Sequence, residues 1–103
     1  MDKEYEDFLY KLLNLLENTD NFMKNNKHII AYHKILGIQQ KLDKIEEEKK
    51  VLLNNERIRI KGMIQYIKDG RYEDVIKNIK ELKKNFYKLY EKIKSENNNN
   101  EKV

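Results

Sequence analysis

The sequence contains no cysteine and no proline, and it has only three glycines among its 103 residues. Without cysteine the chain cannot form disulfides, thiolate zinc sites or cysteine nucleophiles. Without proline, and with so few glycines, a turn-rich all-β fold is difficult to build. Lys, Glu, Leu, Ile and Asn are abundant instead, which favours long helices. The composition therefore predicts a small all-helical protein.

Long apolar runs are also missing. No stretch approaches the roughly 20 consecutive apolar residues that span a bilayer. The first four residues are acidic and lack the basic start of a signal peptide. The apolar run from Phe8 to Leu16 that follows them is interrupted by Lys11 and Asn14. We therefore expect a cytoplasmic or nuclear protein with no membrane span.

The excess of basic over acidic residues is small. The chain has 22 basic and 18 acidic residues, mixed along its length, for a formal net charge of +4. Nucleic-acid-binding proteins usually concentrate basic side chains on one face or stripe. The mixed pattern is more typical of a well-solvated surface, so nucleic acid is disfavoured as a partner.

The most regular pattern in the chain is a heptad repeat near its C-terminal end. Its apolar residues recur at alternating steps of three and four, at Tyr72, Val75, Ile79, Leu82, Phe86, Leu89 and Ile93. This spacing places them along one edge of a helix, an edge that needs a partner helix to cover it. Ile76 and Tyr90 widen the stripe, which indicates contact with a third helix as well.

Similar but less regular patterns predict helices over residues 3–18, 21–36 and 38–68, before a final helix from residue 71. Polar residues at 18–21 provide the first break. Gly37 either ends a helix or lies within a longer one, and we favour continuation. In 38–68 the apolar stripe shifts by one residue between Leu52 and Leu53, which resembles a stutter. Asp69 and Gly70 are the clearest stop signal.

A short turn at Gly70 makes the helices on either side of it antiparallel neighbours. Residues 1–95 should form a single helical domain, and the Asn-rich residues 96–103 should form a disordered tail. We therefore predict an all-α fold, an antiparallel helical bundle or coiled-coil hairpin of three to four helices.

The sequence has no residue pattern typical of a catalytic or metal-binding site. His28 and His33 are five residues apart, which points them about 140° apart on a helix and prevents joint metal binding. Glu46, Glu47 and Glu48 are consecutive, so they point in different directions and do not form an acid/base pair. We expect no catalytic residue, no metal site and no cofactor, and therefore no enzyme.

Two segments of the sequence resemble known families. Leu42 to Ile45, Arg57 and Lys68 resemble the long first helix of the helical chorismate mutases, which would make Arg57 and Lys68 anion ligands. That family has an earlier arginine where this chain has Gln40, and the loop after its first helix is nearly absent here, so we do not assign the family. The segment 57–82 is similar to helical hairpins in C-terminal-to-LisH modules and tethering-complex subunits, which implies protein–protein contact.

The sequence thus predicts a non-enzymatic helical protein–protein interaction module, such as a small subunit or adaptor of a larger complex. Homodimerisation through uncovered apolar surface is an open alternative. The candidate partner-binding residues are Leu13, Leu16, Tyr87 and Tyr90. The competing hypothesis is a basic helical protein associated with nucleic acid. Its contact surface would be the outer face of the last helix, at Lys77, Lys80, Lys84 and Lys88.

Overall fold

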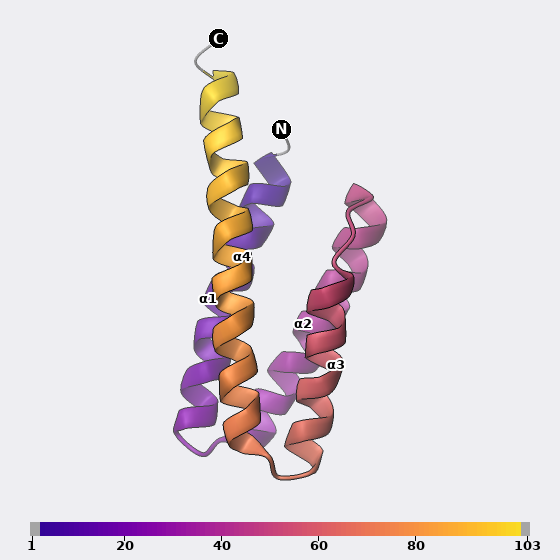
Figure 1. Ribbon diagram of the computed structural model, residues 1–103, viewed down its shortest axis with the longest axis vertical. Coiled ribbons are helices and arrows are strands. Elements are labelled where there is room, and N and C mark those ends of the chain that lie inside the picture. Colours follow the sequence, from indigo (N-terminus) through magenta and orange to yellow (C-terminus); the bar gives the residue numbers. More distant parts are fainter. Residues whose placement is uncertain (1–2, 102–103) are drawn as a thin grey trace.

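The computed structural model describes residues 3–101, and within them the chain forms four α-helices and no strand (Figure 1). The helices are α1 (Lys3–Lys24), α2 (His28–Lys49), α3 (Asn54–Lys68) and α4 (Tyr72–Glu101). The predicted all-α antiparallel bundle is confirmed. None of the helices within this described part has the length and apolar character needed to cross a membrane.

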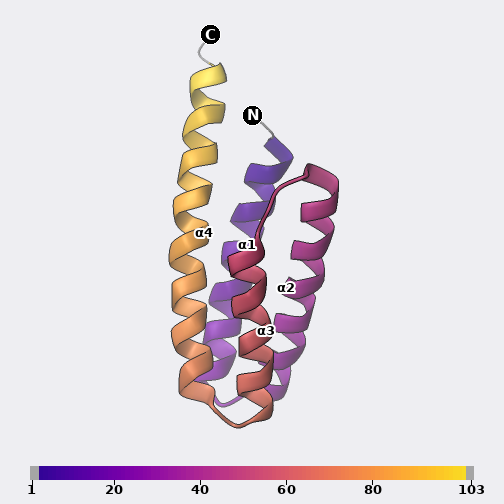
Figure 2. The same ribbon diagram turned by 45° about the vertical axis from the view of Figure 1, so that its right-hand side comes forward.

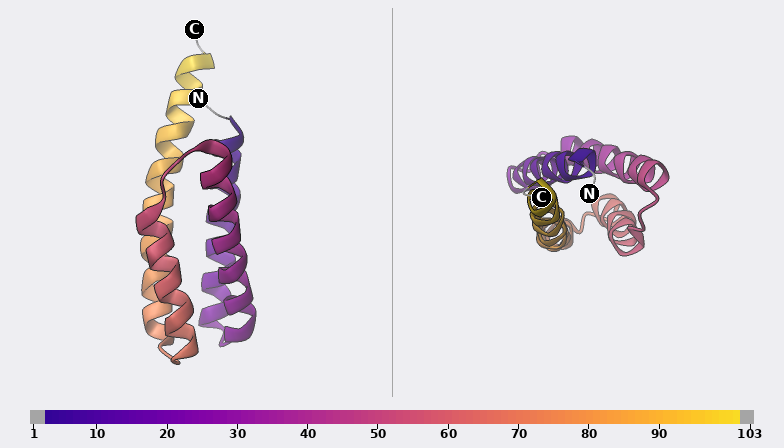
Figure 3. Two further views of the ribbon diagram at one scale, coloured as in Figure 1. Left: turned by 90° about the vertical axis from the view of Figure 1, so that its right-hand side faces the viewer. Right: turned by 90° about the horizontal axis from the view of Figure 1, so that it is seen from above.

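The helices are arranged in a ring in which each runs antiparallel to the next (Figures 2 and 3). α1 packs on α2 and on α4, and α3 packs on α2 and on α4. Among the described residues the two diagonal pairs, α1 with α3 and α2 with α4, make no close backbone contact. Leu9, Leu12 and Leu16 of α1 and Ile35, Ile38 and Leu42 of α2 face the shared core and are almost completely buried.

From Val75 onward the heptad stripe of α4 lies in this core as predicted, whereas Tyr72 at its start is 37% exposed. Val75, Ile79, Leu82 and Phe86 are no more than 1% exposed, and Leu89 is half-buried. α4 reverses direction after α3 at Gly70, whose φ of 73° is a left-handed conformation that glycine adopts readily. However, the most extensive interface of α4 is with α1 rather than with α3. The N- and C-terminal helices therefore form the longest pair in the bundle.

The predicted break at residues 18–21 is wrong, because α1 continues to Lys24. Thr19 stays in the helix by donating a hydrogen bond from Oγ1 to the carbonyl oxygen of Leu15, at 2.7 Å. Asp20 forms an ion pair with Lys24 across one helical turn, at 2.8 Å. The chain turns instead at residues 25–27, where Asn26 has a φ of 61°. Asn tolerates this conformation better than most residues.

The predicted helix over 38–68 is two helices. α2 runs through Gly37, in agreement with the continuation that we favoured, and ends at Lys49. Lys50 then takes a left-handed conformation, with φ 57° and ψ 34°. The shift of the apolar stripe from Leu52 to Leu53 therefore marks a loop, not a stutter.

The tail predicted to be disordered from residue 96 differs from the structure, in which α4 continues through Glu101. The Asn97 side chain is buried and donates a hydrogen bond from Nδ2 to Oε1 of Glu6 in α1, at 2.8 Å. This contact gives the Asn-rich segment a partner that its composition does not reveal. Residues 102 and 103 of the predicted tail lie outside the described residues.

Candidate functional site

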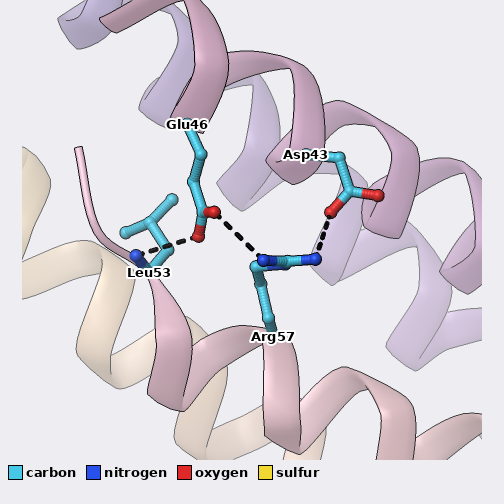
Figure 4. Close-up of polar contacts among 4 residues, drawn as sticks. All are labelled: Asp43, Glu46, Leu53 and Arg57. Atoms are coloured by element: carbon cyan, nitrogen blue, oxygen red, sulfur yellow. Dashed lines mark hydrogen bonds and ion pairs between the residues drawn. The ribbon is translucent and has the colours of Figure 1, made fainter. Parts of the chain in front are cut away.

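The loop between α2 and α3 is held in place by a cluster of polar contacts (Figure 4). Glu46 of α2 accepts hydrogen bonds from the backbone N–H of Leu53, at 2.9 Å, and from the guanidinium of Arg57, at 3.2 Å. The same guanidinium forms an ion pair with Asp43, at 2.9 Å. One carboxylate thus joins the end of the loop to the first turn of α3.

The local sequence explains why this cluster is needed. Leu53 occupies the N-cap position of α3, and its side chain cannot accept a hydrogen bond from the exposed N–H groups of the first turn. Glu46, near the end of α2, accepts a hydrogen bond from the Leu53 N–H instead. Arg57, which one family resemblance would make an anion ligand, is already engaged with Glu46 and Asp43. The cluster is therefore best understood as a device that fixes the loop.

Behind the fixed loop lies an apolar depression of about 420 Å³, which we call the loop pocket. Its walls come from α1, the end of α2, the loop and α4. The lining residues are Tyr5, Lys49, Val51, Leu52, Leu53, Leu89 and Ile93. Lys49 is the one charged member, and its ammonium group forms an ion pair with Glu4. Burial raises the pKa of Tyr5, consistent with a ring that is packed into the apolar wall.

The loop pocket exists because α3 is too short to complete the ring of helices. α3 has 15 residues and α4 has 30. Arg59 of α3 donates a hydrogen bond to Asn78 of α4, at 2.7 Å, and this antiparallel register puts Asn54 level with Lys83. Beyond that level α4 is still packed on α1, but the side of α4 that α3 covers lower down faces the loop between α2 and α3 (Figure 2).

Leu52 is the most exposed large apolar side chain of the described residues, at 84%. It stands at the edge of the loop pocket, between half-buried Val51 and buried Leu53. The sequence analysis missed this site because it placed Leu52 within a continuous helix. The signal that could have found it is three consecutive aliphatic residues after the charged segment 46–50.

The four predicted partner-binding residues have different environments. Leu16 is fully buried in the core, so it offers no surface to a partner. Leu13 is half-buried on α1, and Tyr87 of α4 is 56% exposed. Tyr90 is half-buried, and its ring contacts Tyr10 of α1 with 6.1 Å between ring centroids. Leu13, Tyr87 and Tyr90 remain candidates on the outer side of the α1–α4 pair.

The predicted basic face is present as an exposed stripe on α4, formed by Lys77, Lys80, Lys84 and Lys88. Among the described residues, none of these four lysines forms an ion pair. Glu81 and Glu91 are also exposed on this helix and dilute the positive charge. A hydrogen bond to the Glu91 carboxylate raises the pKa of Tyr87.

Another depression, of about 540 Å³, lies between α3 and α4 and has a mixed polar and apolar lining. Its ionisable side chains are Glu56, Arg59 and Tyr66, and Arg59 is hydrogen-bonded to Asn78. No nucleophile with an adjacent base lines it. Within residues 3–101 no group of three or more His, Asp or Glu side chains is close enough to hold a metal ion.

Comparisons with protein-family models, with curated proteins and with solved structures found no significant match to this chain.

Proposed function

We propose that this protein is a non-enzymatic helical protein–protein interaction module, a cytoplasmic or nuclear subunit or adaptor of a larger complex, and that the loop pocket is a docking site. The partner would insert an apolar helical segment above the start of α3. There it would complete the ring of helices that α3 leaves open.

The observation that carries this proposal is the exposure of Leu52 beside an apolar pocket whose loop is fixed. Covering a leucine side chain stabilises a complex by about 1.5–3 kcal/mol, and α3 and α4 leave this one largely in water. Because Glu46 and Arg57 hold the loop to α2 and α3, little conformational entropy would be lost on binding. Leu52 and the pocket that it lines together form an apolar surface, and removing this surface from water would favour association with a partner.

The proposal is tested by replacing Leu52 with Glu in the full chain. Since Leu52 is exposed, Leu52→Glu should leave the thermal midpoint of unfolding nearly unchanged. Proteins that co-purify with the wild-type chain should be lost from this variant and retained by Ile29→Glu, a matched change at an exposed apolar residue at the opposite end of α2. Equal recovery of the same proteins with both variants would contradict docking at the loop pocket.

Homodimerisation is one outcome of the same experiment. If a second copy occupies the loop pocket, the wild-type chain will have the mass of a dimer in sedimentation equilibrium, and Leu52→Glu will have that of a monomer. A monomeric wild-type chain that captures another protein through Leu52 would favour the adaptor.

The second candidate function is contact with nucleic acid through the lysine stripe of α4. It is favoured by the absence of ion pairs at Lys77, Lys80, Lys84 and Lys88 within the described residues. The affinity for a DNA or RNA duplex should then fall steeply as salt is raised. It should also weaken in Lys80→Glu/Lys84→Glu. Binding that is seen only at very low salt, and that is the same in this variant, would eliminate the candidate.

A further inference from the structure

A second surface lies on the other side of α1, in the outer groove between α1 and α2. Part of this groove is a depression of about 230 Å³ lined by Phe8, Lys11, Leu12, Leu15, Lys41, Lys44, Ile45 and Glu48. Phe8, Leu15 and Phe22 recur every seven residues along α1 and are only partly buried. Phe8 and Leu15 line the depression, and Phe22 extends the same face of α1, so the apolar stripe is about 21 Å long, or roughly four helical turns.

The edges of this groove are predominantly basic. Lys11 of α1 and Lys41 and Lys44 of α2 line it and are exposed. Lys34 is one heptad before Lys41, which puts it on the same face of α2. Glu48 also lines the depression, 3.8 Å from Lys44, and offsets one of these positive charges, while Glu4 is paired with Lys49 outside the depression. An exposed Asp7 lies one turn before Lys11. The groove therefore combines an apolar floor with a net positive rim.

Gly37 lies on the same face of α2, four residues before Lys41 and seven before Lys44. The ion pair between Glu4 and Lys49 sets an antiparallel register that places Leu15 close to the level of Gly37. A Cβ atom added at Gly37 would meet no other atom within 4 Å. Internal packing therefore does not require glycine here, although glycine costs helix stability. A missing side chain at this point leaves room for another helix to approach the groove.

We infer that the groove between α1 and α2 binds an acidic amphipathic helix of a partner protein. The partner's apolar residues, spaced three and four apart, would pack on Phe8, Leu15 and Phe22. Its Asp and Glu side chains would lie against Lys11, Lys41 and Lys44. A helix fits better than a membrane surface because the apolar floor is a groove between two helices with lysines above it, not a protruding ridge. With the loop pocket, the chain would have two separate docking sites.

The test uses the full chain and a designed helical probe peptide of about 18 residues, long enough for four to five turns. The probe carries leucines along one face and glutamates beside them. A second peptide has lysine in place of glutamate, and a third has the same composition in scrambled order. Isothermal titration calorimetry should detect binding of the acidic amphipathic probe, with little binding of the other two.

Two groove variants and one matched control locate the site. Lys11→Glu/Lys41→Glu should weaken binding of the acidic probe by about tenfold or more, because it reverses charge on both sides of the groove. Gly37→Leu should weaken it by a similar factor by filling the groove. It should not lower the thermal midpoint, because leucine is a better helix former than glycine. Lys80→Glu/Lys84→Glu, an equal charge change on α4, should leave affinity within about twofold of wild type, as expected away from a binding site.

This inference does not depend on the loop pocket, and Leu52→Glu should leave probe affinity unchanged. The inference is overturned if the acidic probe does not bind, or if the α4 control weakens it as much as the groove variants do. It is also overturned if the chain does not bind the probe but binds vesicles of phosphatidylserine and phosphatidylcholine. That result would assign the basic groove to a membrane surface.

Discussion

Asn97, near the end of α4, donates a hydrogen bond from its Nδ2 to Oε1 of Glu6, near the start of α1, across 2.8 Å. Both side chains are almost completely buried. Lys3 supplies a second donor to the Glu6 carboxylate, at 3.0 Å. A buried polar pair inside an otherwise apolar helix interface is able to fix the register of the two helices. Here it aligns the last turns of the chain with the first.

Replacing Asn97 with Ala should lower the stability of the protein, because the Glu6 carboxylate would lose its amide donor while still being buried. The midpoint of urea unfolding, followed by circular dichroism, should move to a lower concentration. Asn98→Ala is the matched control, since Asn98 is exposed on the same turn. Equal midpoints for the two variants would show that the contact does not anchor the end of α4.

The stability of the protein should decrease in acid partly through Glu6. Hydrogen bonds from Asn97 and then Lys3 lower the pKa of Glu6 from its ordinary value of 4.5, and a hydrogen bond from Lys83 lowers that of Glu17. A carboxyl group with a lowered folded pKa contributes stability above its unfolded pKa, and that stability is lost as pH falls through the folded value. Urea unfolding between pH 7 and pH 3 should show this loss beginning below about pH 4.5. The acid dependence should be weaker in Asn97→Ala.

Phe86 should be one of the most important core residues. It is 1% exposed and lies in the heptad stripe of α4. Phe86→Ala should lower the free energy of unfolding by about 3–5 kcal/mol through lost burial and a residual cavity. Tyr87→Ala, on the exposed adjacent position, should change it by less than about 1 kcal/mol. Thermal and urea unfolding measure the stability of both variants. A small effect of Phe86→Ala would show that the heptad stripe does not lie in the core.

Glu46 should stabilise the loop more than its neighbours in sequence do. Glu46→Ala removes the acceptor for the Leu53 N–H and one partner of Arg57, and should cost about 1–3 kcal/mol. Glu47→Ala, on the exposed side of α2, should be nearly neutral. Amide hydrogen exchange at Leu53 should become faster in Glu46→Ala alone. Unchanged exchange at Leu53 would mean that the loop is fixed by other contacts.

Two glycines should respond in opposite directions to the same substitution. Gly37 lies inside α2 with open space around it, so Gly37→Ala should stabilise the protein by about 1 kcal/mol. Gly70 has a positive φ, so Gly70→Ala should destabilise it by about 1 kcal/mol. Changes of the same sign in thermal unfolding would contradict the helix boundaries described above.

The sequence predicted the parts of the fold that depend on long, regular patterns. The heptad stripe from Val75 to Phe86 and the turn at Gly70 are where its spacing and local residue chemistry indicate. The prediction was wrong where the same side chain can either cap a new helix or bond within a continuing one. Thr19 and Asp20 suggest a helix cap, but in the structure they bond to Leu15 and Lys24 within one helix.

The run of aliphatic residues 51–53 marks the position of the loop, but which of these residues is buried depends on contacts with other parts of the chain. Leu52 and Leu53 both fit an apolar stripe, and nothing local decides which of them is buried. That choice depends on the left-handed turn at Lys50 and on the bond from Leu53 to Glu46. The role of Asn97 was hidden for the same reason, since its partner Glu6 is at the other end of the chain.

The proposed docking site is tested most directly by photo-crosslinking from position 52. A photoreactive benzoylphenylalanine at Leu52 should give one dominant adduct with a partner protein or a second copy of this chain. The same group at Ile29, an exposed residue at the opposite end of α2, should give none. No adduct from position 52, or the same adducts from both positions, would contradict a partner at the loop pocket.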